Sequence, residues 1–285
     1  MKSSSECNMG RSVGVELPRR GFDHVDATHD PGFFLQYLDQ TRMLPALQEI
    51  EHRIVTEVGS VGATRIVEVG CGTGELLARM TPTSGHGFGI EKSVVLCEAA
   101  QRRHAAHGNL SFIVHDFLEG PLLSSLPIQR PCDALVINRV LQHISNPRIL
   151  LANAARCLRA GSLVILSDVD WSRMTISHPD TETTAQIIGE RCRARINPAV
   201  GSALQDLCGQ FCRGHSRVVA DIQNEITEFG AASNILGFRR SLDILVANGT
   251  VTEAAASAWT QRGIETSAAG TFRSTLFHRI ACATL

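Results

Sequence analysis

Short apolar runs alternate with amphipathic stretches from residue 64 onward. The apolar runs are typical of buried strands and cover residues 65–69, 87–91, 110–115, 134–138 and 163–167. Apolar residues at helical spacing follow most of these runs. Alternation of strand and helix predicts an α/β fold with a doubly wound, mostly parallel sheet and helices on both of its faces.

Two later segments extend the expected sheet to seven strands. Residues 217–222 and 273–282 both have strand character. Residues 172–215, between the fifth and sixth strands, have mostly helical character and are interpreted as an insertion. Further helices are expected near residues 233–247 and 252–262.

Two helices are predicted ahead of the first strand, where they would form a helical cap. Asp30 suits the N-cap and Pro31 the first position of one helix, on which Phe34 and Tyr37 share a face. The second helix is expected over residues 44–58. Phe34 and Tyr37 have two open interpretations, plain packing in the core or a lid over a bound cofactor.

A glycine-rich turn joins the first strand to its helix in the sequence Val67-Glu-Val-Gly-Cys-Gly-Thr-Gly-Glu75. Glycine lets a backbone approach a ligand, and the N–H groups at a helix start attract negative charge. A phosphate-binding loop would need Lys followed by Ser or Thr after the last glycine, and this chain has neither there. A dinucleotide fingerprint would need G-x-G-x-x-G, but Gly74 comes one residue early.

Polar side chains at the ends of the next three strands are further candidates for a nucleoside site. Glu91 closes the second strand, where a carboxylate can accept hydrogen bonds from both ribose hydroxyls. Asp116, followed by Phe117, closes the third strand. Asn138 lies at the carboxyl end of the fourth strand, beside the point at which ligands bind in open sheets. Each also has a simpler interpretation as a strand-end or turn residue.

The glycine turn, with Glu68 before it, closely resembles the first motif of class I S-adenosylmethionine (SAM)-dependent methyltransferases, (D/E)-x-G-x-G-x-G. Residues 132–144 resemble their fourth-strand motif, and Leu158-Arg-Ala-Gly161 resembles their turn before strand five, with Ala160 in place of the usual proline. The resemblance implies a seven-stranded sheet with an antiparallel last strand, SAM as cofactor and S-adenosyl-L-homocysteine (SAH) as product. Together with the lid interpretation, it assigns cofactor binding to Glu68, Gly70, Gly72, Gly74, Glu91, Asp116, Phe117, Asn138 and Tyr37.

The tail of the fifth strand, Ser167-Asp-Val-Asp-Trp171, and the following His178-Pro-Asp180 resemble a bacterial branch of these methyltransferases that acts on small molecules. Several enzymes of natural product biosynthesis belong to that branch. We therefore expect methylation of a small acceptor, a secondary metabolite, at O, N or C, with an aromatic or indole ring among the candidates. Trp171 suits either the floor of an acceptor pocket or an anchor for the insertion.

A general base is needed only when the acceptor must lose a proton. The candidates for that role are His143, His24, His115 and His178, and His143 is the first choice. Arg191 and Arg195 share one helical face, and they suit either an anionic acceptor or the more common case of arginines that are solvated or paired with acids.

Composition narrows the remaining function classes. The 285 residues carry a formal net charge of −1 and the pI is about 6.8, which argues against a broad nucleic-acid surface. No apolar run approaches the roughly 20 residues that span a membrane, and the N-terminus lacks an apolar signal core. The nine cysteines form no C-x-x-C pair, so we expect no metal site and a cytoplasmic protein with reduced thiols.

We interpret the chain as one domain in four parts: a cap at 1–60, a SAM-binding core at 61–171, a substrate lid at 172–215 and C-terminal strands and helices at 216–285. Residues 1–20 are expected to be poorly ordered. The expected partner is a small-molecule methyl acceptor, without nucleic acid or membrane, and we allow for a homodimer. Two alternatives are a methyltransferase acting on tRNA or protein, and a SAM-binding protein without enzymatic activity.

Overall fold

A single seven-stranded sheet organises the protein, with the strand order β3-β2-β1-β4-β5-β7-β6. The computed structural model describes residues 22–27, 30–121, 128, 130–212 and 215–285, so the predicted disorder of residues 1–20 lies outside the described residues. The strands are β1 Arg65–Val69, β2 His86–Glu91, β3 Leu110–Val114, β4 Cys132–Asn138, β5 Leu158–Ser177, β6 Ser216–Ile226 and β7 Arg273–Thr284. Strands β1 to β5 pair in parallel, while β7 is antiparallel to both β5 and β6. The predicted doubly wound sheet with an antiparallel last strand is confirmed.

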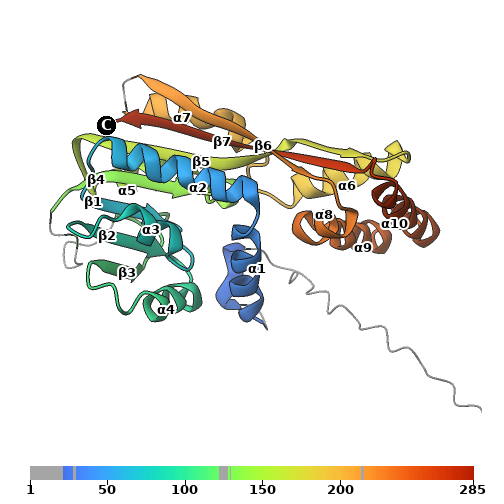
Figure 1. Cartoon of the computed structure of the whole chain (residues 1–285), viewed down its shortest axis with the longest axis horizontal. Helices are drawn as coiled ribbons and strands as arrows, with labels where there is room; N and C mark the ends of the chain where they lie inside the picture. The colour runs from blue at the N-terminus through green and yellow to red at the C-terminus, as the bar shows by residue number, and fades with distance from the viewer. Residues whose placement is uncertain (1–21, 28–29, 122–127, 129, 213–214) are drawn as a thin grey trace, which may run out of the picture.

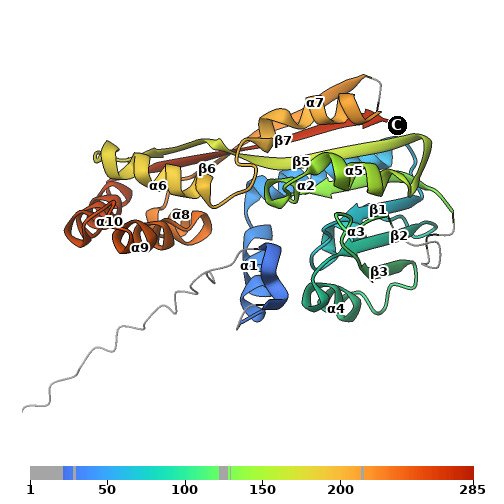
Figure 2. The same ribbon diagram turned by 180° about the vertical axis from the view of Figure 1, so that it is seen from behind.

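Helices cover both faces of this sheet (Figures 1 and 2). They are η1 Phe22–Ala27, α1 Gly32–Arg42, α2 Pro45–Ser60, α3 Glu75–Met80, α4 Val94–Arg103, η2 Leu141–His143, α5 Pro147–Ala155, α6 Thr181–Arg193, α7 Val200–Cys212, α8 Phe229–Leu236, α9 Phe238–Ala247 and α10 Glu253–Ala268. Because side chains alternate along a strand, Ile66 and Ile165 pack beneath α2 and α3, whereas Val67 and Val164 pack beneath α5 and α7.

Strands β5, β6 and β7 continue beyond the parallel strands as a long ribbon (Figure 1). The pairing of β5 with β7 runs on past the end of β4, through an irregularity between Asp170 and Thr175. Helices α6, α8, α9 and α10 pack on this extension around a second core that includes Phe229, Phe238 and Trp259. We call this part, the ribbon with its four helices, the ribbon lobe.

The segment 172–215 is divided between the two parts of the molecule. Helix α6 belongs to the ribbon lobe, whereas α7 packs on β5 and β7 of the main sheet. The helix expected over 233–247 is two helices, α8 and α9, because the backbone turns at Gly237 with a left-handed φ of 72°. The four-part division of the chain, with a substrate lid in the insertion, stays a prediction.

Candidate functional site

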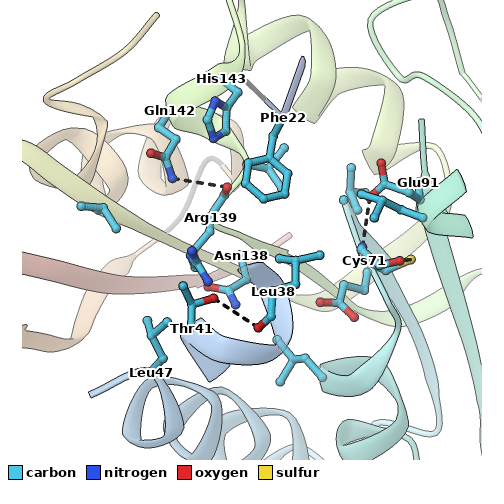
Figure 3. Close-up of a pocket in the computed structure, with 18 of the residues that line it drawn as sticks. Phe22, Leu38, Thr41, Leu47, Cys71, Glu91, Asn138, Arg139, Gln142 and His143 are labelled. Atoms are coloured by element: carbon cyan, nitrogen blue, oxygen red, sulfur yellow. Dashed lines mark hydrogen bonds between the residues drawn. The ribbon is translucent and has the colours of Figure 1, made fainter. Parts of the chain in front are cut away.

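One cavity follows the carboxyl ends of the parallel strands and continues to the ribbon lobe. Figure 3 shows part of its lining, with Glu91 and Asn138 on opposite sides of the glycine turn. Its volume is about 230 Å³, and one water needs about 10–15 Å³ of such space, so the cavity has room for a ligand. We call one end the sheet half, lined among others by Glu68, Gly70, Gly72, Glu91, Asp116, Phe117 and Asn138. The other end is the ribbon half, lined among others by Trp171, Arg195, Asn224, Ile235, Leu236, Leu276 and His278. Phe22 and α1, through Tyr37, Leu38 and Thr41, line the cavity as well.

The glycine turn fixes the backbone of the sheet half. Gly70 has a left-handed φ of 69°, and a Cβ on it would lie 2.3 Å from Cγ2 of Val140. Gly74, also left-handed, does not line the cavity, and a Cβ there would lie 2.5 Å from the ring of Phe112. Gly70 therefore serves the approach of the turn to β4, while Gly74 serves the packing of α3 over β3. For Gly74, the predicted contact with the cofactor has no support in this arrangement.

The carboxylate of Glu91 ties the glycine turn to the end of β2. Its Oε2 accepts a hydrogen bond from Gly72 N at 3.0 Å, and its Oε1 accepts one from Ser93 N at 3.0 Å. Burial raises the pKa of this carboxyl. A carboxylate offers about four lone-pair sites, so each oxygen keeps capacity for a hydroxyl donor from a ligand.

Two buried acceptors in the sheet half lack a donor among the described residues. They are Oε2 of Glu68, at the end of β1, and Oδ1 of Asn138, at the end of β4. Burial raises the pKa of Glu68 well above its usual value. Because a buried polar atom without a partner is costly, both oxygens indicate a donor group that comes from a ligand.

Asp116 and Phe117 complete the sheet half beyond the end of β3. Asp116 accepts a hydrogen bond through Oδ1 from Leu118 N at 2.8 Å, which orients its side chain. Phe117 is buried, and its ring contacts His115 edge to face. Both line the cavity, as a slot for a flat, polar-edged ring would require.

The ribbon half is built around Trp171, at which β5 leaves the main sheet. The indole N–H of Trp171 donates to Oε1 of Gln142 at 2.7 Å. The guanidinium of Arg195 lies over the indole, 4.2 Å from the ring centroid, and its Nε donates to the same Gln142 oxygen at 3.0 Å. Gln142 was not predicted to be a site residue, because no pattern in the sequence distinguishes this buried glutamine from one at the surface.

The histidines differ in whether they line the cavity. His143 lines the cavity beside Phe22, with 6.0 Å between ring centroids (Figure 3), so its predicted role stays open. His24 is exposed on η1 and does not line the cavity, so the structure does not bring this predicted base to the site. His278, which the sequence did not single out, lines the ribbon half, and its Nε2 lies 2.8 Å from Ser167 Oγ. Burial and the charge of Arg139 lower the pKa of His278 to about 3, which makes it a weak base.

Phe34 and Tyr37, which the sequence left open between core packing and a cofactor lid, lie in different surroundings. Phe34 is fully buried and packs with Val25 and Leu96 in a small core. Tyr37 lines the cavity, and its hydroxyl donates to the carbonyl of Ile235, on α8, at a long 3.5 Å. Tyr37 thus joins α1 to the ribbon lobe, and its predicted contact with a cofactor stays a prediction.

A metal centre and a membrane segment were also considered. Within the described ranges, no group of three or more His, Cys, Asp or Glu side chains is placed to hold a metal ion. Of the helices in those ranges, none has both the length and the apolar character needed to cross a bilayer.

A family model described as a methyltransferase domain matches residues 67–164. The matched segment begins in β1, ends in β5, and contains the whole glycine turn together with Glu91, Asp116 and Asn138. It therefore covers every strand end that lines the sheet half.

Curated relatives resemble the chain beyond that segment. An uncharacterized 37.1 kDa protein in transposon TN4556 of Streptomyces fradiae is 28% identical over 233 residues, which cover 79% of this chain and 65% of that protein. The O-methyltransferase rstn1 of Aspergillus nomiae is 28% identical over 153 residues, which cover 52% of this chain and 63% of that protein. The chain thus spans slightly less than two thirds of the length of each.

The YcgJ protein from Bacillus subtilis has a similar solved structure. The TM-score is 0.53 at 14% identity, and the alignment covers 81% of this chain and 97% of that chain. At this identity the likeness supports the fold alone.

Proposed function

We propose that this chain, in which residues 67–164 are a methyltransferase domain of class I fold, transfers the methyl group of SAM to a small-molecule acceptor. SAM is the cofactor of this domain, and it supplies a methyl group already activated on a sulfonium, with a neutral thioether as leaving group. The name of the Aspergillus relative supports oxygen as the acceptor atom.

The residues of the sheet half fit this cofactor. Glu91 keeps lone pairs for the two ribose hydroxyls, and Asp116 and Phe117 suit the amino group and the ring of adenine. The unpartnered oxygens of Glu68 and Asn138 suit the ammonium group of the methionine part, because they are buried acceptors without a donor among the described residues.

The observation that carries the proposal is the continuity of the cavity from the sheet half into the ribbon half. A second ligand in the ribbon half would lie directly beside the cofactor, which is the arrangement that a transfer reaction needs. The aromatic and apolar lining of the cavity is typical of small-molecule sites and supports a small acceptor.

The protein contributes mainly positioning. Holding two reactants in line and away from water supplies much of the rate of a displacement. His143 is the base that we favour for an acceptor that must lose a proton, since it lines the cavity, whereas burial lowers the pKa of His278 to about 3. A carboxylate or an electron-rich ring would need a weaker base or none.

The proposed function can be tested with methyl-labelled SAM, the purified protein and an extract of its native host. Label in the small-molecule fraction would support the proposal and lead to the acceptor. Label in RNA or protein would replace it with the macromolecular alternative. SAM binding without transfer to any fraction would contradict both and favour a binding protein.

A further inference from the structure

Two arginines of the ribbon lobe are withdrawn from water without an acid beside them. Arg191, on α6, is 4% exposed and has no hydrogen-bond or ion-pair partner among the described residues, and its Nε is fully buried. Arg195, just after α6, donates to Gln142 and to the carbonyl of Ala194 but pairs with no acid there. Neither arginine is therefore paired with an acid among the described residues, and Arg191 is also shielded from water, whereas Arg195 is half-buried.

The acids nearest to them are already engaged. Asp168 accepts hydrogen bonds from Gln142 N and Val169 N, and burial raises its pKa to about 6. Glu190 forms an ion pair with Arg193 at 3.2 Å, on the more exposed side of α6. Burial and the neighbouring Arg195 lower the pKa of Arg191 to about 9. A pair of guanidinium groups held in this way is costly unless an anion reaches it.

The cavity provides the route for such an anion. Arg195 lines it, and because its Nε donates to Gln142 and its Nη1 to the carbonyl of Ala194, its Nη2 remains for a ligand. Arg191 lies behind, 5.4 Å from the same Trp171 ring, and Arg139 lines the cavity at the end of β4. The acids among the lining residues all belong to the sheet half and its border with α1, α2 and α3: Glu51, Glu68, Glu75, Glu91 and Asp116. Arg195 thus gives the ribbon half its positive charge, whereas the acids lie in the sheet half, together with the basic lining residues Arg42 and Lys92.

We propose that the methyl acceptor is an oxyanion on an aromatic or apolar body, held by Arg195 with Arg191 behind it. The planar guanidinium group of an arginine matches the oxygens of both a carboxylate and a phosphate, so either group would supply the oxyanion. Trp171, Ile235 and Leu276 supply the apolar walls for the body. This inference rests on the proposed methyl transfer and adds the class of the acceptor.

Direct binding tests the proposal without turnover. The probes are indole-3-acetate, its uncharged counterpart indole-3-acetamide, and phenyl phosphate, each titrated calorimetrically into the SAH-bound protein. The variants are Arg195→Gln and Arg191→Gln, with Arg193→Gln as the matched control because it is exposed on the same helix. Arg195→Lys keeps the charge but loses the planar guanidinium group, so an intermediate result is expected.

The wild type is expected to bind at least one anion about tenfold more tightly than the amide, and Arg195→Gln to weaken that binding by about ten- to a hundredfold. Arg193→Gln should bind as the wild type does. Preference for indole-3-acetate assigns a carboxylate, and preference for phenyl phosphate assigns a phosphate. Equal binding of the amide, unchanged binding in both arginine variants, or no binding of either anion to the wild type would overturn the proposal.

A second measurement separates this proposal from the proposed function. The host extract is split on an anion exchanger before the labelling reaction. We expect the label to enter compounds from the retained, anionic fraction, and Arg195→Gln to lose this transfer while its SAH affinity stays unchanged. Label only in compounds that pass the exchanger would overturn the anionic acceptor and leave the methyl transfer standing. No label in either fraction would overturn the methyl transfer itself.

Discussion

The two halves of the cavity differ in charge and in construction. The sheet half comes from consecutive strand ends, and it holds Glu68, Glu91 and Asp116 without an ion-pair partner among the described residues. The ribbon half comes from segments far apart in the chain, and it holds Arg195 over Trp171 with Arg191 behind them. A cationic cofactor suits the first half, and an anionic acceptor suits the second.

This difference shows how one cavity can keep two ligands in order. Each half favours the ligand of opposite charge and disfavours the other, so a misplaced ligand meets like charges. Gln142 lies between the halves: its backbone N–H donates to Asp168, and its side chain accepts from Trp171 and Arg195.

Substitution of the glycine turn should destroy the sheet half selectively. Gly70→Ala adds a methyl group 2.3 Å from Val140 and strains a left-handed residue, at about 1–2 kcal/mol for the strain alone. Displacement of the turn by overpacking adds about 1–3 kcal/mol, so we expect SAH affinity to fall about a hundredfold or more. Calorimetric titration of SAH measures this.

A matched glycine separates strain from contact. Gly249 is also left-handed, at φ 76°, but a Cβ there would meet nothing within 4 Å. Gly249→Ala should therefore lower stability by about 1–2 kcal/mol and leave SAH affinity unchanged. Val140→Ala should restore part of the loss in Gly70→Ala, and an unchanged affinity in Gly70→Ala alone would contradict the assignment of the turn.

Truncation of Trp171 should damage the ribbon half and spare the other. Trp171→Ala removes the ring that supports Arg195, so the acceptor KM should rise about ten- to a hundredfold while SAH affinity stays the same. Trp171→Phe keeps a ring and loses the hydrogen bond to Gln142, so it should raise the acceptor KM about tenfold or less. Steady-state kinetics with the identified acceptor check this, and a parallel loss of SAH affinity would refute the division of the cavity.

His278 should make the stability of the ribbon half depend on pH. Above pH 6.5 the residue is neutral in both the folded and the unfolded protein. Below that pH the unfolded histidine takes up a proton while the folded one, with a pKa of about 3, does not. Folding free energy should therefore be lost as pH falls, by about 1.4 kcal/mol per pH unit down to about pH 3.

The variant His278→Gln isolates this contribution, because other titrating groups are common to both proteins. The free energy of unfolding of both proteins is measured in urea at pH 7, 6 and 5. The wild type should become less stable relative to His278→Gln as pH falls. A constant difference would show that His278 has the same pKa in the folded and the unfolded protein, and would contradict the lowered value.

Cofactor binding should release protons from the sheet half. Burial raises the pKa of Glu68 and Glu91, and a cationic ligand stabilises their charged forms. SAM affinity should therefore rise with pH through the range in which these carboxyls titrate. Calorimetry at one pH in two buffers of different ionisation enthalpy should detect the released fraction of a proton, and Glu68→Gln should reduce it.

The sheet half could be predicted from the sequence, and the ribbon half could not. Gly70, Glu91 and Asn138 each follow directly from a strand pattern, and parallel strands bring their carboxyl ends to one edge. Arg195, by contrast, reaches the cavity from the segment after α6, and His278 reaches it because β7 pairs with β5, which sets His278 opposite Val169. That pairing joins residues more than one hundred positions apart, and no local pattern encodes it.

Two further sequence predictions were limited by the packing of distant segments. The fifth strand was expected over 163–167, yet β5 continues to Ser177 because β7 supplies it with a partner. His24 was a candidate base on its residue type alone, and the path of the N-terminal segment leaves it exposed. Residue type identifies groups that can do chemistry, but only the packing of distant segments decides which of them share a cavity.

Titration of SAH into one variant from each half tests the separation of the two halves. SAH is titrated into the wild type, Glu91→Ala and Arg195→Gln. We predict that Glu91→Ala weakens SAH binding about a hundredfold, through the loss of charged hydrogen bonds, and that Arg195→Gln leaves it unchanged. Equal weakening in both variants would mean that the cavity is a single site for one ligand, and would contradict the account.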